Sequence, residues 1–259
     1  HVVHIMELSL PEKYTLKEWA LFKALVIVGW MAFLRVSEML GSGRFKDGSP
    51  KDGPSGLDVC DVTVVDNRMD LLVRSAKNDT VAEGHTTTVM AHEAEGKHCA
   101  LKRLRTWMSV AGLRKQPGCT KGKKGCEECN RPACICDCKA CGKLFRNVVH
   151  GKVKETPLDK GRLTRVLREF FDRMEENGDV EPGLSTQVSG ISLRAGGVTE
   201  AAAQGMEREL LAGHGRWKSV SGVEQYDRLD KRKFVRISEG LYKGMATAKP
   251  SRKRRKSAE

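Results

Sequence analysis

The most apolar stretch of the chain runs from Trp19 to Leu34, and Lys23 is the one charged residue within it. A helix that spans a lipid bilayer needs about 18 or more uninterrupted apolar residues. This stretch has 16, so it predicts a helix buried in a protein core and excludes a protein that spans the bilayer.

The same helix has recognisable start and stop signals. Thr15 is followed three residues later by Glu18, the spacing at which each side chain can bond the backbone of the other. Gly41 is a typical helix-stop residue. We therefore expect one long helix from Thr15 to Leu40.

Shorter elements follow this helix. Residues 41–57 hold five glycines and two prolines and predict a loop. Strand-like runs occur at Val59–Val65, Met69–Arg74 and Thr86–Met90. Helical patterns occur at Ala100–Val110, Leu158–Glu176 and about 194–204, 206–213, 219–228 and 231–243. A helix, a small antiparallel sheet and then more helices make an α+β fold class.

Seven of the nine cysteines lie between positions 119 and 141. They include two CxxC pairs, a spacing that turns two thiolates onto one tetrahedral zinc ion. The flanking residues are rich in glycine and lysine, so a metal would supply stability that the segment lacks. A two-zinc cluster, a disulfide knot and an insertion without a fixed fold are the alternatives. We expect a structural zinc insertion at about 115–143, with candidate ligands Cys119, Cys126, Cys129, Cys134, Cys136, Cys138 and Cys141.

The charge of the chain favours a polyanionic partner. Lysine and arginine outnumber aspartate and glutamate by 46 to 33, a formal net charge of +13. Residues 249–256 carry six cations in eight positions, which is typical of a nuclear-targeting or nucleic-acid-binding tail. We therefore expect a nuclear protein with one domain at 1–248 and a disordered basic tail at 249–259.

Two segments contain an arginine that could take part in chemistry. Arg35 closely follows the apolar stretch, and Glu38, one turn further on, is a candidate to hold it because a buried arginine needs a partner. An intrahelical surface pair is the alternative. Arg194 opens a predicted helix in which Gly196 and Gly197 allow close backbone approach.

A third segment has two aromatic residues at a fixed distance. Trp217 and Tyr226 are nine residues apart, and Tyr226 lies among several cations, Arg216 included. A basic surround with an isolated tyrosine is also typical of a helix that contacts DNA.

Taken together, these segments resemble the catalytic domain of the tyrosine recombinases, the phage-integrase family. Arg35 looks like the first catalytic arginine and Arg194 like the second. Lys77 stands between the second and third predicted strands, where the family carries a lysine. Trp217 lies 23 residues after Arg194, where the family has His or Trp, and Tyr226 lies 32 residues after it, where the nucleophile belongs. The segments that look closest to eukaryotic mobile-element recombinases of the DIRS and Crypton types are Leu193–Gly197 and Gly215–Ser219.

The resemblance implies a mostly helical catalytic domain with a small three-stranded antiparallel sheet. Tyr226 would attack the scissile phosphate, leaving a 3′-phosphotyrosine bond and a 5′-hydroxyl. Arg35 and Arg194 would stabilise the doubly negative transition state. Lys77 would protonate the leaving oxygen, and Trp217 would position the phosphate.

The resemblance also implies the partners. The substrate would be double-stranded DNA, bound by a homo-oligomer with a dimer on each site and a tetramer in the synapse. Glu38 would brace the first arginine, since a carboxylate beside phosphate would repel it. The reaction conserves bond energy, so it implies no cofactor for catalysis and no nucleotide.

Three features depart from the family pattern, and the cysteine-rich insertion is one of them. The family usually has a histidine three residues before the second arginine, whereas this chain has Ile191; His214 and His150 are candidates for that role. The chain starts at His1 without the N-terminal clamp domain that the family uses, so we expect it to be part of a longer protein.

Besides a basic α+β nucleic-acid binder with a zinc loop, which explains the charge but not the spacings, three functions are weighed. The first is an active recombinase of a mobile element. The second is a DNA-binding protein on the same fold that has lost catalysis, which Ile191 favours and the retained catalytic-type residues oppose. The third is a type IB topoisomerase, which would relax supercoiled DNA without synapsis.

The cysteine pattern gives a direct prediction. Purified protein should contain about one or two zinc ions per chain, and thiol-blocking reagents should release them because thiolate is the metal-binding form. Elemental analysis before and after treatment measures this. Metal-free protein that is fully folded would contradict the prediction.

Overall fold

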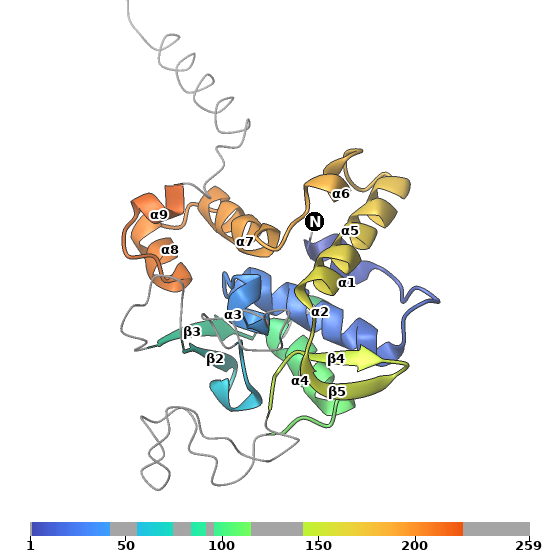
Figure 1. Cartoon of the computed structure of the whole chain (residues 1–259). Helices are drawn as coiled ribbons and strands as arrows, with labels where there is room; N and C mark the ends of the chain where they lie inside the picture. Colours follow the sequence, from blue (N-terminus) through green and yellow to red (C-terminus); the bar gives the residue numbers. More distant parts are fainter. Residues whose placement is uncertain (1, 42–55, 75–83, 92–95, 115–141, 225–259) are drawn as a thin grey trace, which may run out of the picture.

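The described part of the chain is an α+β domain in which other elements pack around one central helix (Figure 1). The computed structural model describes residues 2–41, 56–74, 84–91, 96–114 and 142–224. The helices are α1 (Val2–Glu7), α2 (Leu16–Met31), α3 (Val36–Leu40), α4 (Ala100–Val110), α5 (Lys160–Glu176), α6 (Leu184–Gln187), α7 (Ser192–Ala203), α8 (Arg208–Gly215) and α9 (Ser221–Glu224). The strands are β1 (Val62–Val65), β2 (Arg68–Val73), β3 (His85–Met90), β4 (Arg146–Val149) and β5 (Lys152–Pro157).

Helix α2 is the centre of the core, as its apolar sequence predicts. Leu21, Leu25 and Val28 have no exposed surface. The predicted capping box is present: the Glu18 backbone N–H donates to Thr15 Oγ1 at 3.3 Å, and the Thr15 N–H donates to Glu18 Oε2 at 2.9 Å. In the described ranges no helix is long and apolar enough to cross a membrane.

The one charge in the apolar stretch is satisfied by main-chain carbonyls. Lys23 Nζ donates to the oxygens of Met6 at 2.7 Å and Leu8 at 3.0 Å, and it lies 4.7 Å from the centroid of the Trp19 ring. A buried ammonium group is tolerated where its protons are hydrogen-bonded. Lys23 therefore docks the end of α1 onto α2.

The prediction of one continuous helix from Thr15 to Leu40 is wrong. Helix α2 ends at Met31 and α3 begins at Val36. Between them Phe33 has a φ of +48°, a left-handed conformation that stops a helix. The cause is tertiary packing, because Phe33 leaves the main core and joins a second apolar cluster with residues of α7, α8 and α9. Apolar periodicity does not reveal this break, since the residues on both sides of it are buried.

The three predicted strands form an antiparallel sheet in the order β1-β2-β3. Leu71 in the middle strand is buried and pairs with Val62 on one side and Thr87 on the other. The first strand is shorter than predicted, because Val59–Asp61 forms a 3₁₀ turn before it. This sheet confirms the α+β class.

The sequence pattern does not predict the second sheet, which pairs β4 with β5. Its turn residues, His150 and Gly151, have φ values of +48° and +71°, as the tightest hairpins require. Histidine is an uncommon choice for such a turn, and β5 is mostly exposed and lacks an apolar alternation. The sequence therefore has neither the usual turn residues nor the alternation of apolar residues that would predict a hairpin here.

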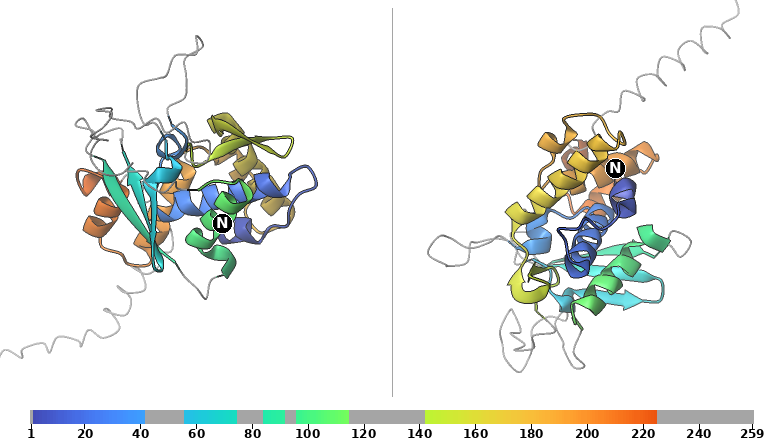
Figure 2. Two further views of the ribbon diagram at one scale, coloured as in Figure 1. Left: turned by 90° about the horizontal axis from the view of Figure 1, so that it is seen from below. Right: turned by 90° about the vertical axis from the view of Figure 1, so that its right-hand side faces the viewer.

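Helices α4 and α5 flank α2 close to where they are predicted. Trp19 of α2 meets Phe170 of α5 edge-on, with 5.2 Å between the ring centroids. On α4, Trp107 Nε1–H donates to the oxygen of Leu144 at 2.8 Å. Figure 2 shows α2 running between the three-stranded and the two-stranded sheet.

Gly197 and Gly196 in α7 make a matched pair of test positions. A Cβ at Gly197 would lie 2.3 Å from the oxygen of Trp30, whereas one at Gly196 would lie 3.6 Å from the Trp30 ring, an ordinary contact. We expect Gly197→Ala to lower the free energy of unfolding by about 1–3 kcal/mol. Gly196→Ala should leave it unchanged or raise it by up to about 1 kcal/mol, because alanine favours helix. Urea titrations with equal midpoints for the two variants would contradict this.

Candidate active site

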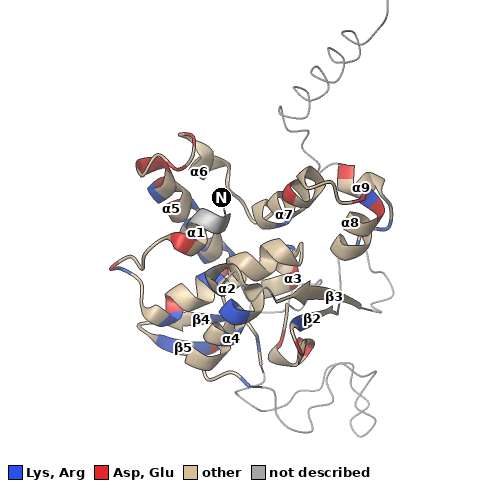
Figure 3. Ribbon diagram, turned by 180° about the vertical axis from the view of Figure 1, so that it is seen from behind, with Lys and Arg blue, Asp and Glu red and all other residues tan. Residues whose placement is uncertain are grey.

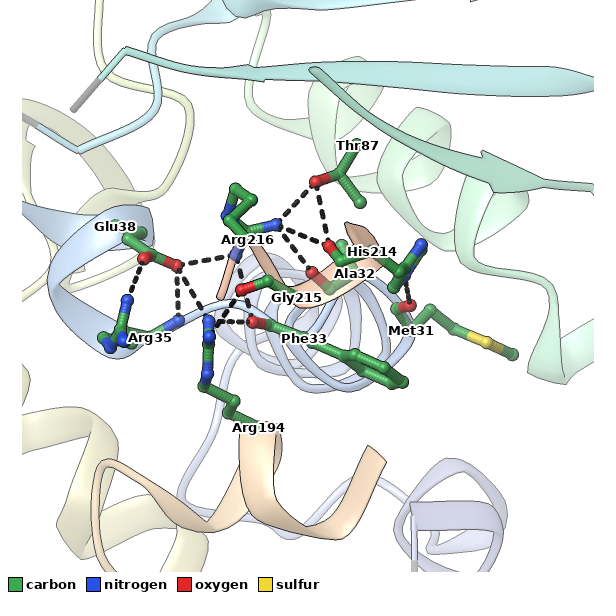
Figure 4. A network of polar contacts seen from close by, with 10 residues as sticks. All are labelled: Met31, Ala32, Phe33, Arg35, Glu38, Thr87, Arg194, His214, Gly215 and Arg216. Atoms are coloured by element: carbon green, nitrogen blue, oxygen red, sulfur yellow. Dashed lines mark hydrogen bonds and ion pairs between the residues drawn. The ribbon is translucent and has the colours of Figure 1, made fainter. Parts of the chain in front are cut away.

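Four charged side chains meet where α2 ends and α3 begins (Figure 4). The side chain of Glu38 has no exposed surface, and its Oε2 lies 2.8 Å from Arg216 Nη2 and 3.7 Å from Arg194 Nη1. Its Oε1 lies 2.8 Å from Arg35 Nη1. The three arginines come from the N-cap of α3, from α7 and from the C-cap of α8. We name these four residues the Glu38 cluster.

Arg35 is the most exposed cation of the Glu38 cluster, with 20% of its side chain accessible. It is the N-cap of α3, so its own backbone N–H donates to Glu38 Oε2 at 2.8 Å. The helix break at Phe33 thus turns Arg35 from a residue inside a helix into one that starts a helix. A guanidinium held on one side by a carboxylate can offer its other donors to an anion.

Arg194 has no exposed surface. Its Nη1 donates to the oxygen of Phe33 at 2.7 Å, and its Nη2 donates to the oxygen of Gly215. Its guanidinium lies 3.9 Å from the centroid of the Trp217 ring. Arg194 therefore joins α7 to the break after α2 and to the end of α8, from a position behind the indole.

Trp217 fills a space that two glycines provide. A Cβ at Gly215 would lie 1.7 Å from the Trp217 ring, and a Cβ at Gly222 would lie 2.5 Å from it. The ring packs on the second apolar cluster and covers the Arg194 guanidinium. The structure thus gives Trp217 a packing role, and it explains why glycine stands at both positions.

Arg216 is the member of the Glu38 cluster that sequence reasoning missed. The sequence suggests a cation in a basic surface, but only 3% of its side chain is exposed. Its backbone lies in the left-handed region, with φ +60° and ψ 40°, a conformation that costs a non-glycine residue about 1–2 kcal/mol. The only signal in the sequence is its place between Gly215 and Trp217.

The electrostatics of the Glu38 cluster favour an ionised carboxylate. Burial raises the pKa of Glu38, but the charge of Arg216, the Arg35 N–H and the charge of Arg194 together outweigh burial and hold the pKa below its ordinary value. Three guanidiniums against one carboxylate leave two surplus positive charges. That surplus has the sign that stabilises a phosphoryl-transfer transition state.

The structure places the two candidates for the missing histidine in different surroundings. His214 Nε2 donates to the oxygen of Met31 at 2.8 Å, and the ring meets Phe33 edge-on with 4.7 Å between centroids. Burial lowers the pKa of His214 and keeps it neutral. His150 lies in the β4–β5 turn, outside the elements that form the Glu38 cluster. Ile191, at the N-cap of α7, is 46% exposed.

Lys77, Tyr226 and the seven clustered cysteines lie outside the described residues. The structure does describe residues next to the Lys77 segment and next to the cysteine segment. One residue from each place pairs with the same carboxylate, that of Asp58. Arg74, three residues before Lys77, donates to Asp58 Oδ2 at 2.9 Å. Lys143, just after the cysteine segment, lies 3.1 Å from Asp58 Oδ1. Asp58 therefore joins the described residue before one segment, Arg74, to a described residue after the other, Lys143.

Of the three tyrosines in the sequence, Tyr14 is the one in the described ranges. Its hydroxyl donates to the Glu169 carboxylate, and burial raises its pKa. A nucleophilic tyrosine needs the opposite shift. Across these same ranges no group of three or more His, Cys, Asp or Glu residues is placed to hold a metal ion.

The described fold is similar to that of solved site-specific recombinases, which confirms the fold that the sequence resemblance implies. XerH bound to palindromic difH substrate, a post-cleavage complex, gives a TM-score of 0.55 at 13% identity over 92% of this chain and 49% of its own. XerH bound to difH substrate, a pre-cleavage complex, gives a TM-score of 0.52 at 12% identity, and the match covers 90% of this chain and 49% of XerH. XerA recombinase gives a TM-score of 0.51 at 13% identity, and the match covers 93% of this chain and 60% of XerA. This chain thus spans about half the length of XerH. No family model and no curated sequence matches it.

The pKa direction of Glu38 predicts how stability depends on pH. Because the folded pKa lies below the ordinary value of 4.5, the stabilisation is fully present above pH 4.5 and is lost as pH falls through the folded pKa. Urea unfolding of wild type and Glu38→Gln from about pH 7 to about pH 3 isolates this effect. The difference between their free energies of unfolding should shrink as pH falls. A constant difference would contradict the prediction.

Proposed function

We propose that this chain is the catalytic domain of a site-specific recombinase that cleaves and rejoins double-stranded DNA through a phosphotyrosine intermediate. The observation that carries the proposal is the Glu38 cluster, in which three segments of a recombinase-like fold bring arginines together with two surplus positive charges. Positive charge fixed in place before the substrate arrives is the chief requirement for catalysis on a phosphodiester.

In the proposed reaction the Tyr226 oxygen forms a bond to the scissile phosphorus, and the bond from phosphorus to the 5′ oxygen breaks. The phenolic proton passes to solvent, and Lys77 donates a proton to the leaving oxygen, which becomes a 5′-hydroxyl. A 5′-hydroxyl of another strand then attacks the phosphorus of the phosphotyrosine and gives its proton back to Lys77, while the bond from phosphorus to the tyrosine oxygen breaks and the released tyrosine takes a proton from solvent. One ester replaces another at each step, so no nucleotide is consumed.

The two predicted arginines take different parts in this proposal. Arg35 reaches solvent and can donate two parallel hydrogen bonds to non-bridging oxygens. Arg194 acts from behind Trp217, through its charge and by holding the carbonyls of Phe33 and Gly215. Direct contact between Arg194 and a phosphate oxygen requires the Trp217 ring to turn aside. Trp217 would then present its indole N–H to the same phosphate.

The surface charge suits a DNA partner along part of the domain. Figure 3 shows basic residues on α4 and α5, and acidic residues at the connection from α5 to α6. Lys102 and Arg105 of α4 and Arg165 and Arg168 of α5 are exposed, as contacts to a phosphate backbone require. We propose that these helices, and not the α5–α6 connection, face DNA.

The remaining features of the proposal rest on the sequence. The resemblance of the Leu193–Gly197 and Gly215–Ser219 segments supports an origin in a eukaryotic mobile element. The basic run at 249–256 supports a nuclear location, and the cysteine spacing supports a structural zinc ion. A homo-oligomer, a dimer on each DNA site and a tetramer in synapsis, would supply one tyrosine for each of the four DNA strands that exchange.

A DNA-binding protein that has lost catalysis is the second candidate. The observation that favours it is Ile191, which stands exposed at the N-cap of α7 where the family has a histidine. Isoleucine neither exchanges a proton nor binds phosphate. If this second candidate holds, the protein binds DNA and forms no covalent product.

Covalent trapping tests the proposed function. Protein is incubated with a pool of nicked duplexes of randomised sequence, and adducts are separated on a denaturing gel. Wild type and Tyr14→Phe should form an adduct, and Tyr226→Phe should form none, because only Tyr226 is the nucleophile. Arg35→Ala should slow adduct formation by about 10²–10³-fold.

The outcomes separate the candidate functions. DNA binding without an adduct would reject the recombinase and favour the silent DNA-binding protein. An adduct accompanied by relaxation of supercoiled DNA, without exchange of strands between duplexes, would indicate a topoisomerase. An adduct that survives Tyr226→Phe would show that the nucleophile is another residue.

A further inference from the structure

Arg216 makes an unusual number of contacts for one buried side chain. Its Nη2 donates to Glu38 Oε2 at 2.8 Å and to the oxygen of Phe33 at 3.1 Å. Its Nη1 donates to the Thr87 hydroxyl at 2.5 Å, and to the oxygens of His214 at 3.2 Å and Ala32 at 3.3 Å. These partners lie on the α2–α3 break, on β3 and on α8, so one guanidinium joins three parts of the domain (Figure 4).

We propose that Arg216 is a positioning residue that pairs with Glu38 Oε2, so that the positive charge of Arg194 remains uncompensated and available to an anionic phosphodiester. This inference rests on the proposed function, since it assigns a role within that reaction. It adds a residue that the family resemblance of the sequence does not include.

The distances support a competition for one carboxylate. Glu38 Oε1 pairs with Arg35 Nη1 at 2.8 Å. Glu38 Oε2 is 2.8 Å from Arg216 Nη2 but 3.7 Å from Arg194 Nη1, so Arg216 and not Arg194 is the second close partner of the carboxylate. Interaction between buried charges rises steeply as they approach in a medium of low dielectric constant. Without Arg216, the side chain of Glu38 would have Arg194 and Arg35 as its cationic partners. The surplus of the Glu38 cluster would fall from two positive charges to one.

The backbone of Arg216 supports a dedicated role for its side chain. Position 216 is a helix C-cap in the left-handed region, where glycine or asparagine is the usual choice. Arginine is retained at a position where its backbone is strained. The side chain compensates through its five hydrogen bonds.

The contact with Thr87 extends this role to a second part of the proposed site. Thr87 is 2% exposed and lies on β3, the strand that follows the segment carrying Lys77. Arg216 therefore sets the position of β3 relative to Glu38. A lysine could pair with the carboxylate, but its single ammonium does not span Thr87 and Glu38 as a planar guanidinium does.

A mutant cycle tests the competition. The variants are Arg216→Gln, Glu38→Gln and the double variant, with Arg216→Lys as the variant that keeps the charge. Two quantities are measured: the rate of adduct formation at saturating DNA, and the affinity for inorganic phosphate by ³¹P NMR titration. Thermal melting and circular dichroism establish that each variant is folded.

Arg216→Gln should slow adduct formation by about 10–100-fold and weaken phosphate binding by about fivefold or more. Adding Glu38→Gln should recover at least part of both losses, because the carboxylate that captures the remaining arginines is then neutral. Arg216→Lys should bind phosphate within about twofold of wild type, since it still pairs with Glu38. If Arg216→Gln does not fold, the lysine variant alone carries the phosphate test.

A double variant no better than Arg216→Gln would overturn the proposal, because a purely structural arginine predicts additive losses. Equal phosphate affinity for wild type and Arg216→Gln, or a loss in Arg216→Lys as large as in Arg216→Gln, would also overturn it. If wild type forms no adduct, the proposed reaction fails, and the phosphate titrations still decide whether Arg216 competes for Glu38.

Discussion

The buried carboxylate of Glu38 is the constraint around which the described domain is arranged. A charge without solvent is costly unless cations and N–H groups surround it, and those groups come from positions as far apart as Arg35 and Arg216. In the same arrangement the chain interrupts its most apolar segment at Phe33, starts a new helix at Arg35 and brings α7 and α8 back to the same point. Phe33 contributes to both the apolar packing and the polar contacts. Its ring packs against residues of α7 and α8, and its carbonyl oxygen accepts hydrogen bonds from Arg194 and Arg216.

Local patterns were sufficient to predict the parts of the fold whose residues interact with near neighbours. The strands of the first sheet and helix α4 follow from alternation and amphipathic spacing, and the capping box at Thr15 follows from two residues. The break at Phe33 does not, because it depends on a contact with Gly197, which is distant in the sequence. The β4–β5 hairpin is also hidden, since its turn uses histidine and its outer strand carries no apolar pattern.

The same division holds within the candidate site. The pairing of Arg35 with Glu38 is visible in the sequence because the two residues are three apart. The close approach at Gly197 is likewise visible, because a glycine beside a catalytic-type arginine suggests it. The burial of Arg216 is not, since a run of cations after a glycine is more often exposed. Sequence patterns also do not reveal that the Trp217 ring covers Arg194. Arg194, which the sequence resemblance identifies as a catalytic arginine, therefore has no exposed surface.

The anchoring by Asp58 has a consequence for how such a domain can change over evolutionary time. Trp107, before the 115–141 segment, donates to Leu144, after it, and Lys143, also after it, pairs with Asp58. The entropy of closing a loop grows only with the logarithm of its length, at about 0.6 kcal/mol per doubling. Between two points fixed in this way, a change in the length of the connecting chain therefore changes the closure entropy little. The arginines around Glu38 are held by other contacts than those of Trp107, Lys143 and Leu144.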